Sequence, residues 1–340
     1  MPGGVAFVSG ISGTGTGEYL QRVVEEARAV GHEHEVEVHD VGQIMREHAE
    51  RDTPGVNWDL ILDADEVQLR LLRSLALQQV ASSVAAQPAA LHLIDMHLSF
   101  RWRAFLTKGI DVHALEPFRP IVRCFVNLIQ DLSQLQERLK STSWGERGIL
   151  QLLVWRDEEL FLSTLYGDML DRTSCVVLPV AEPPAMLERI IWHPEVRRVY
   201  LSFPITAIQD DHSAREEIRQ FRDRLREFAV VFDPYASKDY DETYTRPEML
   251  ALQKEIGDVA RVRDYRFIDQ AEAVVVYYPK RVASKGVDAE MAHAHKSGKP
   301  IYIYCPEDLG GGPFAVPPSH FRSDPGQYLT LLREHLGRRS

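Results

Sequence analysis

Glu290 occupies a position at which a carboxylate could do chemistry. The apolar run Ala273 to Tyr278 predicts a buried strand, a turn and a helix follow from Ser284, and Ile301 to Tyr304 predict a second strand. In a βαβ unit of this kind, ligands bind beyond the carboxyl ends of the strands. We therefore expect Glu290 to face a ligand, although the helix macrodipole alone also favours a Glu in the first turn.

Two neighbouring features strengthen the case for a site at Glu290. Ser284 and Gly286 lie on the turn before the helix, where a hydroxyl and free backbone N–H groups can bind an anion. Asp264 lies in a predicted helix that leads into the Val-rich strand. In glycosyl transfer, one carboxylate attacks the anomeric carbon and a second one handles protons on the leaving group. The two carboxylates beside a small anion site therefore favour glycosyl transfer.

Four segments of the second half, in this order, resemble the nucleoside 2-deoxyribosyltransferase family, and particularly its 2′-deoxynucleoside 5′-phosphate N-hydrolase branch. They are Tyr200 to Ile205, the helix and strand that hold Asp264, Ala271 and Val274 to Val276, the turn from Ser284 to Glu290, and Gly298-Lys299-Pro300, all within residues 196–310. The resemblance implies that Glu290 is the nucleophile toward the sugar C1′. It also implies that Asp264 positions the substrate and assists the departing base, and that Tyr200 lines the pocket.

The same resemblance implies the remaining substrate contacts of this half. Ser284, with Gly286, would contact a 5′-phosphate, and Ser202 and Phe203 would line the substrate pocket. The loop after the first strand departs from the family, which has small residues where this chain has a Phe-Pro pair. No cofactor is implied for glycosidic cleavage, and we expect a homo-oligomer because the family commonly completes its site with a neighbouring subunit. We also expect residues 233–259 to form a lid over the site.

A glycine-rich loop begins the first half of the chain. It follows a predicted strand, Val5 to Ser9, and precedes a predicted amphipathic helix from Glu18 to Val30. This order of strand, glycine-rich turn and helix is typical of a phosphate-binding loop. The loop residues that we expect to contact phosphate are Gly10, Gly13, Gly15, Thr16 and Gly17. The full P-loop pattern has Lys and then Ser or Thr where this chain has Thr16 and Gly17, so the Lys that reaches the β- and γ-phosphates is absent.

The first half also resembles the archaeal-type adenylate kinase group of P-loop kinases, over residues 4–180. The resemblance rests on Val38 to Met45 as the second strand and its turn, and on Leu91 to His97 as a strand that ends in Asp-x-His. Asp95 of that motif is a candidate to hold Mg²⁺ through water, or else a cap for the next segment. Three interpretations stay open: an active kinase with ATP and Mg²⁺ as cofactors, a unit that binds nucleotide without turnover, and a structural or oligomerising remnant.

Length and patterning place the two halves in separate domains. A chain of 340 residues can form two domains of ordinary size. The Pro-rich stretch around Pro183 and Pro184 suits a linker. We therefore expect a P-loop domain over residues 1–180, a linker with a bridging helix over 181–195, and a deoxyribosyltransferase-like domain over 196–340. Both halves alternate strands and helices, which predicts two three-layer α/β domains with mostly parallel sheets.

Composition excludes several classes of function. The net charge of −11 argues against a broad basic surface for duplex nucleic acid. The three cysteines lie in or beside apolar runs, which indicates buried thiols in a reducing compartment. His92 and His97 lack companion ligands at metal spacing, so no metal site is expected. We find no signal peptide and no membrane span, and therefore expect a cytoplasmic protein without a membrane partner.

Taken together, these patterns predict an enzyme that cleaves the N-glycosidic bond of a small nucleotide or nucleoside, by hydrolysis or by deoxyribosyl transfer. The P-loop-like half would then have a regulatory or structural role. Two alternatives stay open. One is a catalytically inert nucleotide-binding sensor, which the degenerate P-loop favours, and the other is a glycohydrolase that cleaves NAD⁺.

Overall fold

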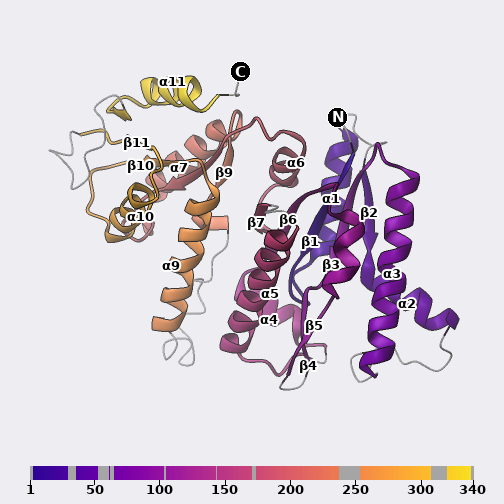
Figure 1. Cartoon of the computed structure of the whole chain (residues 1–340). Helices are drawn as coiled ribbons and strands as arrows, with labels where there is room; N and C mark the ends of the chain where they lie inside the picture. Colours follow the sequence, from indigo (N-terminus) through magenta and orange to yellow (C-terminus); the bar gives the residue numbers. More distant parts are fainter. Residues whose placement is uncertain are drawn as a thin grey trace. The chain divides into compact units, whose positions relative to one another are not determined.

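The computed structural model describes residues 3–29, 36–52, 61, 65–102, 105–142, 144–170, 174–236, 253–307 and 320–337. The chain forms two compact units, Met1–Trp192 and His193–Ser340 (Figure 1). Helix α6 (Pro184–Trp192) packs on α1 (Thr16–Ala29) and belongs to the first unit. The apolar side chains of α6 are buried, which makes this helix part of the first unit. The boundary between the units therefore falls inside the segment 181–195, which the sequence marks as a linker.

The first unit is built on a five-stranded parallel sheet with the order β2-β3-β1-β6-β7. Its strands are β1 (Gly4–Ser9), β2 (Val36–Asp40), β3 (Leu91–Met96), β6 (Val122–Ile129) and β7 (Ser174–Pro179). Around it lie α2 (Val41–Asp52), α3 (Glu66–Ala86), η2 (Val112–Phe118), α4 (Leu132–Leu139), α5 (Ile149–Met169) and the antiparallel pair β4 (Ser99–Trp102) and β5 (Phe105–Lys108). Each residue of β1 is buried, as expected for a central strand with helices on both faces.

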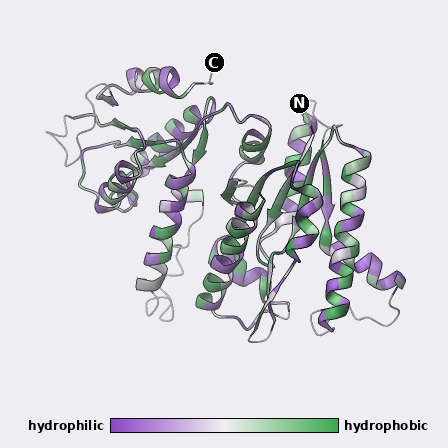
Figure 2. Cartoon of the chain, in the orientation of Figure 1, coloured by the Kyte–Doolittle hydropathy of each residue, from purple (hydrophilic) through white to green (hydrophobic). Residues whose placement is uncertain are grey.

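Helices α3 and α5 build the main hydrophobic core of the first unit. Leu77 and Val80 of α3 and Tyr166 of α5 join a cluster with Phe7 of β1 and Phe125 of β6. The rings of Phe7 and Phe125 stack with their centroids 4.9 Å apart. Figure 2 shows the consequence in the hydropathy pattern: the strands are largely hydrophobic, while the helices alternate between hydrophobic and hydrophilic residues.

The second unit has its own parallel sheet, in the order β12-β11-β10-β8-β9. Its strands are β8 (Arg198–Ser202), β9 (Val230–Phe232), β10 (Ala273–Tyr277), β11 (Ile301–Tyr304) and β12 (Phe321–Arg322). Its helices are η3 (Thr206–Ile208), α7 (His212–Arg226), η4 (Pro234–Ala236), α9 (Gln253–Gln270), α10 (Lys285–Lys296) and α11 (Pro325–Leu336). The predicted α/β fold class with mostly parallel sheets is thus confirmed for both units.

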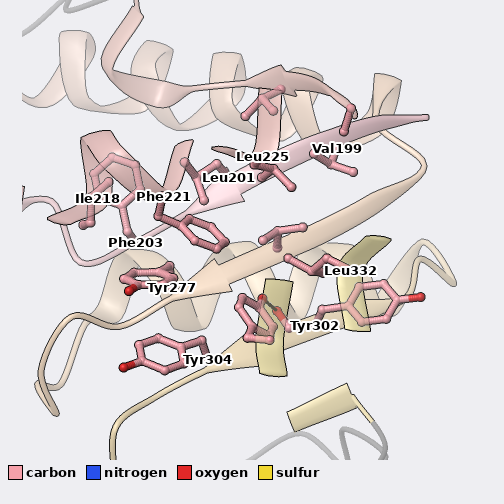
Figure 3. Close-up of a cluster of buried hydrophobic side chains, with 14 of the residues drawn as sticks. Val199, Leu201, Phe203, Ile218, Phe221, Leu225, Tyr277, Tyr302, Tyr304 and Leu332 are labelled. Carbon is pink, nitrogen blue, oxygen red and sulfur yellow. Dashed lines mark hydrogen bonds between the residues drawn. The ribbon is translucent and has the colours of Figure 1, made fainter. Parts of the chain in front are cut away.

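An aromatic core covers one face of the second sheet (Figure 3). Phe221 of α7 stacks on Tyr277 of β10 with ring centroids 4.2 Å apart. From α11, the buried hydroxyl of Tyr328 lies 3.1 Å from the carbonyl oxygen of Val276 and 2.7 Å from that of Tyr302. In β8, Val199 and Leu201 alternate with Arg198, Tyr200 and Ser202, and successive side chains of a strand point to opposite faces.

This alternation positions the polar residues of β8. Val199 and Leu201 join the aromatic core, so Tyr200 and Ser202 point to the opposite face of the sheet. Helix α9 packs against β8, and α10 packs against β10 and β11. The two helices carry Asp264 and Glu290 to this second face. Among the helices that the structure describes, none is long and apolar enough to cross a membrane.

Candidate functional site

The glycine-rich loop, Gly10–Gly17, joins β1 to α1 and includes the first two residues of that helix. Its backbone requires glycine at two positions. Gly13 and Gly15 have φ angles of 86° and 87°, in the left-handed region that residues with a side chain rarely adopt. A Cβ on Gly15 would also lie 2.5 Å from Oε2 of Glu18. At Gly17, in contrast, a Cβ would meet only Oδ2 of Asp95, at 3.7 Å. The space where a P-loop has its Ser or Thr is therefore open.

The loop lines a cavity of about 480 Å³. The first N–H groups of α1 have no acceptor within the helix, and the helix macrodipole adds positive potential at this end, so this wall can bind an anion. Of the predicted phosphate contacts, Gly13, Gly15, Thr16, Gly17 and Asp95 line the cavity. Gly10 does not line it; instead its carbonyl oxygen lies 2.5 Å from Nδ1 of His97. Gly10 therefore helps to hold the loop.

Two aspartates meet at the carboxyl ends of β2 and β3. Asp40 and Asp95 are paired in the parallel register, and both line the cavity. Burial, and then the nearby charge of Asp40, raise the pKa of Asp95 to about 8. Carboxylates that repel each other beside a phosphate-binding loop would be stabilised by a divalent cation. The carboxyl ends of β2 and β3 are therefore a candidate site for Mg²⁺.

His97 connects the end of β3 to the loop. Burial lowers its pKa, so the imidazole is neutral near pH 7 and its Nδ1–H donates to the carbonyl of Gly10. Its ring packs edge-on against Phe100 at a centroid distance of 5.3 Å. From the sequence, His97 was the last residue of the Asp-x-His motif and no metal site was expected there; in the structure its contact with Gly10 positions the loop.

Arg73 of α3 is a cavity residue that sequence reasoning missed. Its side chain lines the cavity but is only 4% exposed. Nη1 lies 3.6 Å from Oε1 of Glu66, whereas Nε and Nη2 have no hydrogen-bond partner among the described residues. Buried polar groups are almost always paired, so these two donors point to an anionic ligand. The available signal was a charged residue on the apolar stripe of α3, four positions after the buried Leu69.

Arg138 of α4 brings a second cation to the loop. Its Nη2 lies 2.5 Å from a carboxylate oxygen of Glu18, and the pair is partly exposed to solvent. A Cβ on Gly15 would lie 3.1 Å from Nη1 of Arg138, so the guanidinium lies against the loop. Arg138 also lines the cavity. A cation therefore stands beside the loop although the P-loop Lys is absent from it.

In the second unit, Tyr200 and Ser202 both donate hydrogen bonds to Glu290. The Tyr200 hydroxyl lies 2.9 Å from Oε1 and the Ser202 hydroxyl lies 2.5 Å from Oε2. Burial, and then the charge of Asp264, raise the pKa of Glu290 to about 8, and burial raises the pKa of Tyr200 well above its ordinary value. Asp264 itself pairs with Arg263 at 2.9 Å. Of the predicted residues of this half, the structure thus brings Tyr200, Ser202 and Asp264 to Glu290.

The remaining predicted contacts of the second unit have structural roles in the fold. Ser284 caps α10, since its Oγ accepts from the Val287 N–H at 3.4 Å, and Gly286 lies in the first turn of that helix. Phe203 is buried in the aromatic core, where its ring lies 5.2 Å from that of Tyr235. Most of the predicted lid, residues 237–252, lies outside the described residues.

A third cluster appears where the sequence spacing showed none. Glu37 and His39 of β2 lie beside His92 of β3, with one ligand atom of each residue within 4.8 Å of the others. Sequence spacing could not give His92 these companions, because 53 residues separate it from His39. Parallel pairing of β2 with β3 brings them together.

Comparison with known proteins gives a family match within the first unit. Residues 9–148 match the family model of an AAA domain. A sugar kinase from a Janibacter species is 15% identical, with 56% of this chain and 94% of that chain covered and a TM-score of 0.32. A thymidylate kinase from Candida albicans is 14% identical, and the match covers 57% of this chain and 93% of that chain with a TM-score of 0.36. A shikimate kinase from Bacteroides thetaiotaomicron is 11% identical, and the match covers 55% of this chain and 98% of that chain with a TM-score of 0.34. A search of curated proteins finds no match.

The family match supports the predicted P-loop nature of the first unit and contradicts the predicted N-glycosidic cleavage. The family match lies on the unit that contains the glycine-rich loop. The prediction of a nucleoside or nucleotide N-glycosidase, deoxyribosyltransferase or NAD⁺ glycohydrolase is therefore wrong. The deoxyribosyltransferase resemblance of the second unit receives no support. Carboxylates at strand ends occur in many unrelated α/β sites, so the Glu290 pattern could not specify this reaction.

Proposed function

We propose that the first unit is a phosphotransferase. It binds the phosphates of a nucleoside triphosphate, as the Mg²⁺ complex, at the Gly10–Gly17 loop and transfers the terminal phosphoryl group to an acceptor that carries an anionic group. The observation that carries this proposal is Arg73, a buried guanidinium in the same cavity as the loop, two of whose nitrogens have no partner in the part of the chain that the structure describes. One anion-binding element would suffice for a nucleotide alone, whereas two in one cavity suit a donor and an acceptor held together.

The charges of the cavity fit this chemistry. Phosphoryl transfer is catalysed mainly by positioning and by stabilising the charge on the transferred group. The loop amides and the start of α1 supply the phosphate cradle, and Arg138 supplies a cation against the loop. Arg73 supplies a second cation from α3, where it would hold the anionic group of the acceptor. Together they replace the positive charge that the absent Lys would bring.

Asp40 and Asp95 are the residues that fit Mg²⁺. Mg²⁺ binds through carboxylate and water oxygens, and it would neutralise part of the phosphate charge. Burial, and then the charge of Asp40, disfavour a negative charge on Asp95 and raise its pKa to about 8. Cation binding would therefore release the proton of Asp95.

The test is a transfer assay with matched variants. ATP and Mg²⁺ would be incubated with nucleoside monophosphates, hydroxy acids and sugar acids, and both ADP release and the phosphorylated product would be measured. We expect turnover in the wild type and its loss in Gly15→Ala and Arg73→Met. The matched control is Gly298→Ala, because Gly298 also has a positive φ, of 68°, but lies in the second unit. Nucleotide binding without a phosphorylated product from any acceptor would refute the transfer, and absence of nucleotide binding would refute the whole proposal.

A further inference from the structure

We propose that Glu37, His39 and His92 form a zinc-binding site that joins strand β2 to strand β3. It lies in the first unit, it is independent of the proposed phosphotransferase activity, and it follows from the strand register. Glu37 and His39 are two residues apart on β2 and so point to the same face of the sheet. In the parallel register Glu37 pairs with His92, which brings the second imidazole to the same place.

The distances suit two imidazole ligands of one ion. His39 Nε2 lies 2.9 Å from His92 Nδ1, and a carboxylate oxygen of Glu37 lies within 4.8 Å of both. Two nitrogens bound tetrahedrally to zinc at about 2.0–2.1 Å are roughly 3.3 Å apart. The imidazole nitrogens therefore need to separate by only a few tenths of an ångström to admit the ion between them.

A backbone carbonyl orients His92 in the way that metal-bound histidines are usually oriented. The His92 Nε2–H donates to the carbonyl oxygen of Gln87 at 3.0 Å. The lone pair of Nδ1 is then directed toward His39. This carbonyl, at the end of α3, supplies the outer contact that fixes the tautomer of a metal-bound imidazole.

Metal binding would replace one hydrogen bond and leave the charge of both rings unchanged. In the free protein the Nε2–H of His39 donates to Nδ1 of His92. With zinc bound, the proton of His39 resides on its Nδ1 instead, and Nε2 of His39 and Nδ1 of His92 each give a lone pair to the ion. The Glu37 carboxylate provides the third ligand and one negative charge. Water completes the four ligands.

The donor set and its exposure favour zinc with access from the sheet edge. Two imidazoles and one carboxylate suit zinc, whereas Ca²⁺ and Mg²⁺ prefer sites made of oxygen alone. His92 is fully buried, His39 is nearly buried, and Glu37 is partly exposed on the edge strand, so the ion can enter past Glu37. His39 precedes Asp40 and His92 lies three residues before Asp95. A bound ion would therefore hold together the two strands that carry the paired aspartates.

The experiment is a zinc titration of the full chain after treatment with a chelator. Zinc affinity would be measured against a competing chromophoric chelator, and the bound metal would be counted by elemental analysis. We expect one zinc per chain in the wild type. Loss of an outer contact to a metal ligand costs about 10- to 100-fold in affinity, so removing a ligand in His39→Gln should cost at least about 100-fold. Glu37→Gln should also weaken binding. Both side chains lie on the edge strand, so neither test depends on replacing the fully buried His92.

Two controls separate this site from other histidines. His48→Gln removes an imidazole that bonds Gln79 elsewhere in the first unit, and it should leave zinc affinity unchanged. The double variant His32→Ala, His34→Ala removes nearby histidines of the sequence that lie outside the described residues, and it should retain one zinc. Circular dichroism would confirm that each variant is folded. Unchanged affinity in folded His39→Gln, loss of binding in the double variant, or less than one zinc bound by the wild type would each overturn the proposal.

Discussion

Replacing Arg73 by Met should make the first unit more stable and less able to bind an anion. The side chain is 4% exposed, and two of its nitrogens have no partner among the described residues. Each unpaired buried polar group costs about 1–3 kcal/mol, and the contact with Glu66 offsets part of that cost. Met has a similar length and needs no partner. We therefore expect the free energy of unfolding of the first unit to rise by about 1–2 kcal/mol.

The same change should weaken binding of the anionic acceptor. Removing one partner of a buried charge pair costs about 2–5 kcal/mol, which corresponds to an affinity loss of at least about 30-fold. Urea unfolding would measure the stability, and calorimetric titration with inorganic phosphate and with candidate acceptors would measure the affinity. A fall in stability with unchanged anion affinity would refute the reasoning, because Arg73 would then serve the fold and not a ligand.

Arg222 provides the contrasting control. Its guanidinium lies 3.0 Å from Oδ2 of Asp233, whose side chain is 2% exposed. Arg222→Met leaves that buried carboxylate without its cation, so the second unit should lose about 1–3 kcal/mol of stability. The two Arg→Met changes should therefore move stability in opposite directions. If both variants changed the free energy of unfolding by the same amount, the loss of the arginine itself, and not whether it was paired, would determine the stability change.

Three further outcomes are expected. The pKa of Glu290 is raised from 4.5 to about 8, so the folded second unit holds a proton that the unfolded chain releases. Its unfolding free energy should fall between about pH 4.5 and 8, by about 3 kcal/mol after allowance for partial exposure, and Glu290→Gln should abolish the dependence in urea titrations at several pH values. Because the pKa of Asp95 is about 8, Mg²⁺ affinity measured by calorimetry should rise by up to about tenfold per pH unit below pH 8, and this rise should be absent in Asp95→Asn. Gly15→Ala should lower the melting temperature through a backbone cost of about 1–2 kcal/mol, whereas Gly17→Ala, which has open space for a Cβ, should not lower it.

The elements around the glycine loop could be predicted from sequence because the signals are local. The apolar run before Gly10 becomes β1, and the helix after the loop becomes α1, ending at Ala29. The predicted strand that ends in Asp-x-His becomes β3. Likewise, the predicted strands around Glu290 become β10 and β11, joined by α10. Strand alternation and helix caps depend on neighbours in the sequence, and a single chain displays them directly.

The missed residues depend on contacts between distant segments. Arg73 is an ordinary charged residue until α3 packs against the sheet and buries its guanidinium beside the loop. His39 and His92 become neighbours only through the register of β2 on β3. Likewise, Phe203 was predicted to contact substrate, but the pleat of β8 and the packing of α7 place it in the core. Spacing along the chain contains none of these distances.

The position of α11 has a consequence for the order in which the chain can fold during synthesis. Tyr328 of α11 is fully buried against the carbonyls of Val276 and Tyr302, so the part of this face that α7 does not cover stays open until residues beyond Pro325 have left the ribosome. The first unit needs no residue beyond Trp192, and domains fold as units from the N-terminus. The nascent chain should therefore carry a finished first unit while part of the aromatic face of the second is still exposed. This interval is when the chain is most open to aggregation and to chaperone binding.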